Sequence, residues 1–132
     1  MEYRSEVFLG ISFESPERMD EVLAVYALDP LVQKNEALGY WNIDRDWARM
    51  WYYDDYVTWY PELGDVHEAI HHIEKVAEDF AKNRGFQYRS YFFRIGEEPT
   101  DLEERAEGNT LVPGLFAFED VVHLERRLFV NL

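Results

Sequence analysis

A long amphipathic helix is the clearest element that the sequence predicts. Apolar residues recur at intervals of three and four between Asp65 and Gly85, so they form one stripe along a helix. Asp65 is suited to cap the first turn, and Gly85 stands where many helices end in the left-handed conformation. We therefore expect a helix over 65–84 whose apolar side packs against another layer. The stripe consists of Val66, Ala69, Ile70, Ile73, Val76, Ala77, Phe80 and Ala81.

Other strands and helices are predicted on both sides of this helix. Three segments have the alternation or the composition of strands: 6–13, 86–95 and 122–130. Two further helices are predicted over 16–28 and 30–38, because each begins with a capping residue followed by proline.

Aromatic residues are concentrated in residues 40–60, which contain all four tryptophans and five of the nine tyrosines. This density favours strands. The polar pair Asp54-Asp55 interrupts the run, which predicts a hairpin turn joining strands 47–53 and 56–60.

Both faces of the predicted strand 47–53 are apolar. One face carries Trp47, Trp51 and Tyr53, and the other carries Ala48, Met50 and Tyr52. One face is expected to pack on the helices, so the other must be covered by the rest of the chain or by a partner. A homodimer formed through these aromatic strands is one such arrangement.

The order of the predicted elements indicates the fold class. Strands and helices that interleave around a hairpin predict an α+β fold, with helices on one face of a mostly antiparallel sheet. This order is similar to a ferredoxin-like fold with extra elements. The acidic stretch 97–107 is expected to be a loop or a very short helix. Since the chain has no repeats and no linker, residues 1–132 are predicted to form a single domain.

The net charge restricts the partners of the chain. Thirteen basic residues stand against 27 acidic ones, a net charge of −14, whereas a magnitude of roughly 2–8 is enough to keep a small domain soluble. Such a charge repels nucleic acid and anionic lipid and attracts basic surfaces. The absence of cysteine excludes thiolate zinc sites and disulfides. With no leader and no apolar run near the ~20 residues of a membrane span, we expect a soluble cytoplasmic protein.

The predicted helix 65–84 contains a motif that zinc peptidases use. His67-Glu68-Ala69-Ile70-His71 matches the pattern H-E-x-x-H, in which two histidines bind zinc and the glutamate acts as the general base. A zinc-dependent hydrolase with ligands His67 and His71 and base Glu68 is therefore the alternative function. At about 100° per residue, both histidines flank the apolar stripe on its polar side. The simpler interpretation is a solvated helix face that binds no cofactor and has no catalytic residue, with His71–Glu74 or Lys75–Asp79 pairs along it.

In size, charge and aromatic content the whole chain resembles the small acidic inhibitors of phages and mobile elements. These include anti-restriction and anti-CRISPR proteins. The chain also resembles immunity proteins that neutralise basic nuclease toxins. The resemblance implies a protein that occupies the basic, nucleic-acid-binding surface of a target, where carboxylates take the place of phosphates. Nucleic acid itself would not be bound. The candidate contact residues are Asp54, Asp55, Glu97, Glu98, Asp101, Glu103, Glu104 and Glu107.

Overall fold

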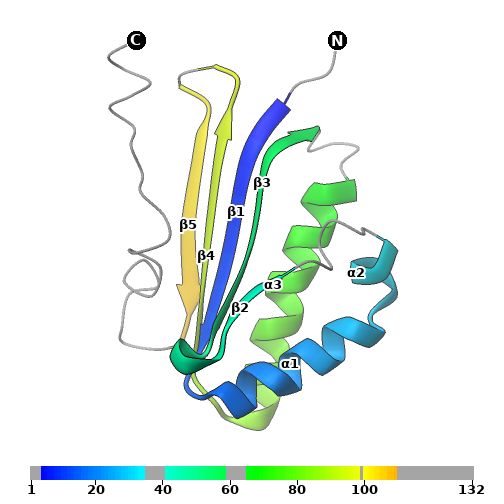
Figure 1. Cartoon of the computed structure of the whole chain (residues 1–132), viewed down its shortest axis with the longest axis vertical. Coiled ribbons are helices and arrows are strands. Elements are labelled where there is room, and N and C mark those ends of the chain that lie inside the picture. The colour runs from blue at the N-terminus through cyan, green and yellow to red at the C-terminus, as the bar shows by residue number, and fades with distance from the viewer. Residues whose placement is uncertain (1–3, 35–40, 59–64, 99, 110–132) are drawn as a thin grey trace.

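A five-stranded antiparallel sheet with helices on one face forms the computed structural model, which describes residues 4–34, 41–58, 65–98 and 100–109 (Figure 1). The strands are β1 (Arg4–Phe13), β2 (Asn42–Asp44), β3 (Arg49–Thr58), β4 (Tyr88–Gly96) and β5 (Leu102–Gly108). The helices are α1 (Pro16–Leu28), α2 (Pro30–Lys34) and α3 (Asp65–Arg84), with a 3-10 turn, η2 (Arg45–Trp47), between β2 and β3. The predicted α+β class is thus confirmed, while the ferredoxin-like assignment stays a prediction.

The strands are ordered β2-β3-β1-β4-β5, so the first strand of the chain lies at the centre of the sheet. Its alternating residues set the register on both sides: Leu9 lies opposite Tyr52 of β3 and opposite Phe92 of β4. These neighbours all point toward the helices, because side chains at paired positions share one face of a sheet. The apolar alternation of β1 therefore defines the core.

The core lies between this face of the sheet and the apolar stripe of α3. Leu9 and Ile11 of β1 are fully buried, as are Ile70 and Ile73 of α3. The buried hydroxyl of Tyr26 on α1 donates a hydrogen bond to the carbonyl oxygen of Ile73 at 2.7 Å, which ties the two long helices together. The predicted strand 6–13 and the predicted stripe are confirmed, apart from Val66, whose side chain lies outside the described residues.

The predicted helix starts are also present. The Oγ of Ser15 accepts a hydrogen bond from the backbone N–H of Arg18 at 3.3 Å, with Pro16 in the first turn of α1. Asp29 plays the same part for α2, since its Oδ1 accepts from the backbone N–H of Val32 at 3.3 Å. The predicted continuation of α2 to residue 38 lies outside the described residues.

Helix α3 ends as its sequence predicts. Gly85 adopts a left-handed φ of 73°. The N–H groups of Gly85 and Phe86 both donate to the carbonyl oxygen of Ala81, at 2.8 and 3.1 Å. This satisfies a carbonyl that the helix leaves without a partner and turns the chain into β4.

The predicted hairpin at Asp54-Asp55 is wrong. Strand β3 continues from Arg49 to Thr58 and pairs with β1 on both sides of Asp55, with a bulge-like register shift at this point instead of a turn. The real turn precedes β3 at η2, where Ala48 has a left-handed φ of 50° and reverses the chain from β2.

The acidic stretch 97–107 was expected to be a loop or a short helix, and this prediction is wrong as well. Its second half is strand β5, which is paired with β4 from Leu102 to Gly108. The predicted last strand at 122–130 lies outside the described residues. Within the described chain, no helix has the length and apolar content that crossing a membrane requires.

Two residues fasten the end of β5 to the start of β4. Gly108 has a φ of 141°, and a Cβ at this position would lie 2.4 Å from the carbonyl oxygen of Tyr88. The side chain of Asn109 accepts from the N–H of Tyr88 at 2.8 Å and donates to the carbonyl oxygen of Phe86 at 2.9 Å. We call this arrangement of Gly108 and Asn109 the clasp.

Substitution of the clasp glycine is predicted to destabilise the protein strongly. We expect Gly108→Ala to lower the free energy of unfolding by at least about 3 kcal/mol, because a strained backbone is combined with a clash against a neighbouring carbonyl. Gly85→Ala is the matched control and should cost about 1 kcal/mol, since left-handed backbone alone opposes it and no atom lies within 4 Å of the added Cβ. Urea unfolding of both variants measures the difference, and equal losses would contradict the role of the clasp.

Candidate functional site

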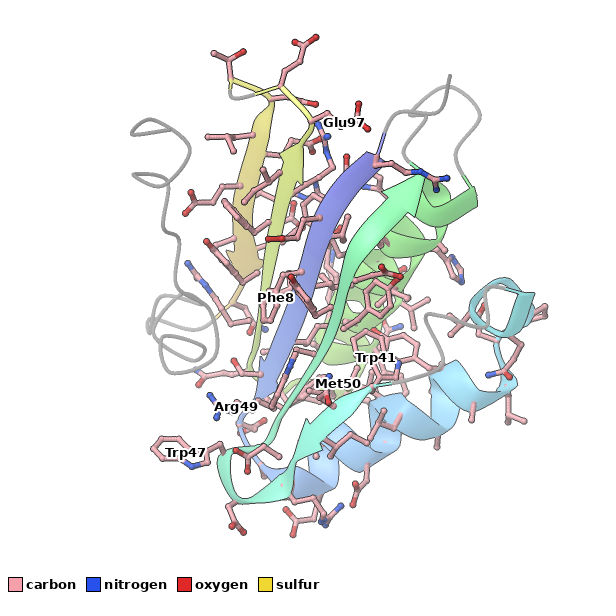
Figure 2. The ribbon with its side chains drawn as sticks, turned by 45° about the horizontal axis from the view of Figure 1, so that its top comes forward. Phe8, Trp41, Trp47, Arg49, Met50 and Glu97 are labelled. Carbon is pink, nitrogen blue, oxygen red and sulfur yellow. The ribbon has the colours of Figure 1, made fainter. Side chains whose placement is uncertain are left out.

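The eight acids predicted to contact a partner do not form a single patch. Asp54 lies on β3, three strands from β5 in the sheet order and therefore about 14 Å away. Its carboxylate accepts a hydrogen bond from the hydroxyl of Tyr52 at 3.2 Å, and the side chain of Asp55 lies outside the described residues. The other six acids gather on the β4–β5 turn and on β5, and Figure 2 labels Glu97 at that end of the sheet. They are Glu97, Glu98, Asp101, Glu103, Glu104 and Glu107.

Two of these six acids are engaged by a buried arginine of β4. Arg94 donates to both carboxylate oxygens of Asp101, at 2.8 and 3.1 Å, and to Glu103 at 2.9 Å. It also donates to the Oγ of Ser5 on β1 at 3.1 Å. Burial works to lower the pKa of Arg94, but the hydrogen bonds to Asp101 and Glu103 raise it above its usual value, so the guanidinium remains charged. Asp101 and Glu103 therefore attach β5 and its turn to the sheet.

A second arginine attaches β5 to α3. Arg105 binds both carboxylate oxygens of Glu74, with Nε 3.1 Å from Oε2, and its guanidinium lies 4.2 Å from the centroid of the Phe92 ring. Glu74 is buried, so its predicted place on a solvated face beside His71 is wrong: that flank of α3 faces β5. The predicted pair Lys75–Asp79 is present at 3.3 Å.

The remaining acids of this region are exposed. The carboxylate of Glu97 accepts from the backbone N–H of Arg4 at 3.0 Å, and that of Glu104 accepts from the hydroxyl of Tyr91 at 3.2 Å. Glu98 and Glu107 are exposed on the turn and on β5. We call Glu98, Glu104 and Glu107 the acidic edge. Glu104 and Glu107 stand on β5, which the two arginines attach to the sheet and to α3, and Glu98 stands on the turn before it.

An aromatic row crosses the face of the sheet away from the helices and ends at this edge. Tyr53 of β3, Phe8 of β1, Phe93 of β4 and Glu104 of β5 occupy successive paired positions. Phe8 and Phe93 are buried, whereas Tyr53 is 50% exposed. An exposed aromatic side chain and an exposed acid thus stand on the same face.

The two-faced character of the aromatic run is confirmed for β3, but the predicted start of the strand at Trp47 is wrong, because Trp47 and Ala48 belong to η2 and its turn. Met50 and Tyr52 are buried in the core, while Trp47 is 72% exposed and projects from η2 in Figure 2. The guanidinium of Arg49 lies 5.7 Å from the centroid of the Trp47 ring and 5.5 Å from that of Trp51. These contacts orient the exposed tryptophan, because a cation over an aromatic face is attracted to it. The homodimer through these strands stays a prediction.

The zinc motif lies on α3, but the side chains of His67 and Glu68 are outside the described residues. The side chain of His71 is exposed. Within the described ranges, no three His, Asp or Glu side chains gather in a way that would hold a metal ion. The alternative zinc site stays a prediction.

The structure also brings together residues that the sequence did not single out. A pocket of about 390 Å³ lies between α3 and the end of β5, and Glu107 of the acidic edge forms part of its wall. Glu78 and Lys82 of α3 and Tyr88 of β4 line it as well. The i, i+4 spacing of Glu78 and Lys82 was the only signal in the sequence, and it indicates a surface pair rather than a pocket.

Comparison of the chain with protein-family models, with curated protein sequences and with solved structures found no match in any of the three.

Loss of the buried arginine is predicted to destabilise the protein. We expect Arg94→Met to lower the free energy of unfolding by about 2–3 kcal/mol, below the 3–5 kcal/mol typical of a fully buried pair, because Asp101 and Glu103 are about a third exposed. Lys75→Ala removes an exposed ion pair and should cause no measurable loss. Urea unfolding measures the free energy of unfolding of both variants. An equal loss in Arg94→Met and Lys75→Ala would contradict the structural role of Arg94.

Buried tyrosines predict a loss of stability at alkaline pH. Burial, followed by the charges of Glu78 and Glu107, raises the pKa of Tyr88 to about 12, and burial also raises that of Tyr26. Between the unfolded pKa of about 10 and the folded value, the unfolded chain loses protons that the native state keeps. Stability should therefore fall as pH rises through this interval. Denaturant unfolding from pH 9 to 12 measures the slope, which Tyr88→Phe should reduce and Tyr53→Phe, at a half-exposed position, should leave nearly unchanged.

Proposed function

We propose that the protein binds the basic, nucleic-acid-binding surface of another protein and thereby inhibits it. The observation that carries this proposal is the acidic edge, in which Glu104 and Glu107 are exposed on β5 and Glu98 on the turn before it. Arg94 and Arg105 fix this part of the sheet. Charges on a fixed strand lose little conformational freedom on binding, so more of their attraction appears as affinity.

Charge favours a basic protein over nucleic acid as the partner. Six acids lie between Glu97 and Glu107, and Arg94 and Arg105 neutralise only part of that charge. A surface that contacts phosphates is rich in lysine and arginine, and a negative field attracts it over a distance. The protein would compete with nucleic acid for such a surface.

Aromatic residues provide a second source of affinity beside the charges. Tyr53 shares its face of the sheet with Glu104, and Trp47 is exposed on η2, just before β3. Tyrosine and tryptophan are the residues most enriched at the energetic centres of protein interfaces. The acidic edge would steer the approach of the partner, and the aromatic side chains would contribute contact area.

Reversal of charge at the acidic edge tests the proposal. The probe is a lysine decapeptide bound to a fluorescent DNA duplex, and displacement of the duplex by the protein is followed by anisotropy. Wild-type protein should displace the duplex, less effectively as salt increases. Glu98→Lys with Glu104→Lys should weaken displacement by at least about tenfold, equivalent to about 1.4 kcal/mol.

The matched control is Glu17→Lys with Asp46→Lys, which changes the same charge at exposed positions of α1 and η2. This control should displace the duplex clearly better than the variant with Glu98→Lys and Glu104→Lys. Thermal melting of each variant verifies that it folds. Absence of displacement by wild-type protein would refute the proposal, and so would equal losses in the two variants, because the edge would then have no special part.

A further inference from the structure

The pocket between α3 and the end of β5 has an acidic wall. Glu78 comes from α3 and Glu107 from β5, and Gly108 and Asn109 of the clasp line the pocket as well. Because the clasp fixes Gly108 and Asn109 through three hydrogen bonds to Phe86 and Tyr88, this wall is rigid.

A buried tyrosine opens into the same pocket. Tyr88 is 5% exposed, and its ring belongs to the hydrophobic core. Its hydroxyl makes no hydrogen bond within the part of the chain that the structure describes, yet it is not sealed from solvent. Burial, followed by the charges of Glu78 and Glu107, raises the pKa of this hydroxyl, and both glutamates line the same pocket. Because this hydroxyl reaches the pocket and has no partner among the described residues, it can form a hydrogen bond with a ligand bound there.

We propose that this pocket binds the primary ammonium group of a lysine side chain presented by the basic partner. This inference rests on the proposed function and specifies one of its contacts. A lysine ammonium has three N–H donors. The pocket offers three oxygen groups from three different elements: the carboxylates of Glu78 and Glu107 and the hydroxyl of Tyr88.

Other cations fit this set of groups less well. A guanidinium is recognised best by a planar pair of acceptors in a fixed fork, whereas the oxygens here come from separate elements. Calcium takes six to eight oxygen ligands, and the described residues contain no cluster of three metal-binding side chains. A compact ammonium group needs neither arrangement.

Lys82 lines the pocket from α3 and makes no ion pair among the described residues. Its positive charge opposes the entry of a second cation. Removal of this charge should therefore strengthen binding, whereas removal of either carboxylate should weaken it. If loss of the Lys82 charge strengthens binding and loss of a carboxylate weakens it, the cation binds in this pocket by charge.

Titrations followed by amide NMR test the proposal with a defined probe. The probe is Nα-acetyl-lysine methylamide, which carries one side-chain ammonium group. It should shift the amide signals of Lys82, Gly108 and Asn109 in a saturable way. The same compound acetylated on Nε lacks the charge and should produce no such shifts. Nα-acetyl-arginine methylamide should bind more weakly than the lysine compound.

Single substitutions locate the binding. Glu78→Gln and Glu107→Gln should each weaken it by at least about threefold, within the range for an ion pair at a partly open site. Tyr88→Phe keeps the ring and should also weaken binding, whereas Lys82→Gln should strengthen it. Glu98→Gln makes the same change of charge outside the pocket and serves as the matched control. Far-UV circular dichroism verifies the fold of each variant.

Several results would overturn the inference. These are equal shifts with the Nε-acetylated compound, shifts confined to residues away from the pocket, and an effect of Glu98→Gln as large as that of Glu107→Gln. Saturable binding of spermidine without binding of the lysine compound would also overturn it, because the pocket would then accept a polyamine instead of a lysine side chain.

The two proposals fail separately. The displacement experiment changes Glu98 and Glu104, which lie outside the pocket, and the titrations use no polybasic peptide. If duplex displacement occurs without binding of the lysine compound, the function stands and the lysine pocket is refuted. If the compound binds but wild-type protein displaces no duplex, the pocket binds ammonium and the proposed inhibition is refuted.

Discussion

Strand β5 is attached to the protein by charge rather than by a hydrophobic face. The side chains that it turns toward the helices are Glu103, Arg105 and Glu107, so apolar burial cannot fix its position. Its backbone ladder with β4, the buried guanidinium of Arg94, the Arg105–Glu74 pair and the clasp do so instead. The acidic edge and the pocket beside α3 both depend on this attachment, because both are built on β5.

This attachment divides the acids of the region into two groups with different tasks. Asp101, Glu103 and Glu74 form ion pairs with Arg94 and Arg105, which offset about two of these three charges. Glu104 and Glu107 are exposed on the same strand and carry charge to the surface. A high net charge therefore overstates the number of carboxylates that a partner would meet. The structural acids fix the positions of the exposed ones, of which Glu104 stands on the face away from the helices and Glu107 on the face toward them.

The regular spacing of apolar residues made much of the fold predictable. The predictions were wrong where this spacing is absent, at β5 and in the middle of β3. Helix α3 and strand β1 follow from apolar spacing, since burial of one side requires it. Strand β5 lacks apolar alternation because ion pairs replace apolar contacts there, so its sequence resembles a loop. Two adjacent aspartates suggested a turn in β3, but pairing with β1 maintains the strand. Glu107 was predicted as a contact residue, whereas Glu78 and Tyr88 become its neighbours only through tertiary packing.

The two edges of the sheet differ in length and chemistry, but both discourage the addition of a strand from another chain. Within the described residues, β2 forms one edge and is only three residues long. The other edge, β5, is longer but rich in glutamate. An exposed edge invites another chain to add a strand, and short or charged edges discourage it. Two copies aligned along β5 would oppose like charges, so the features that favour a basic partner also resist self-aggregation.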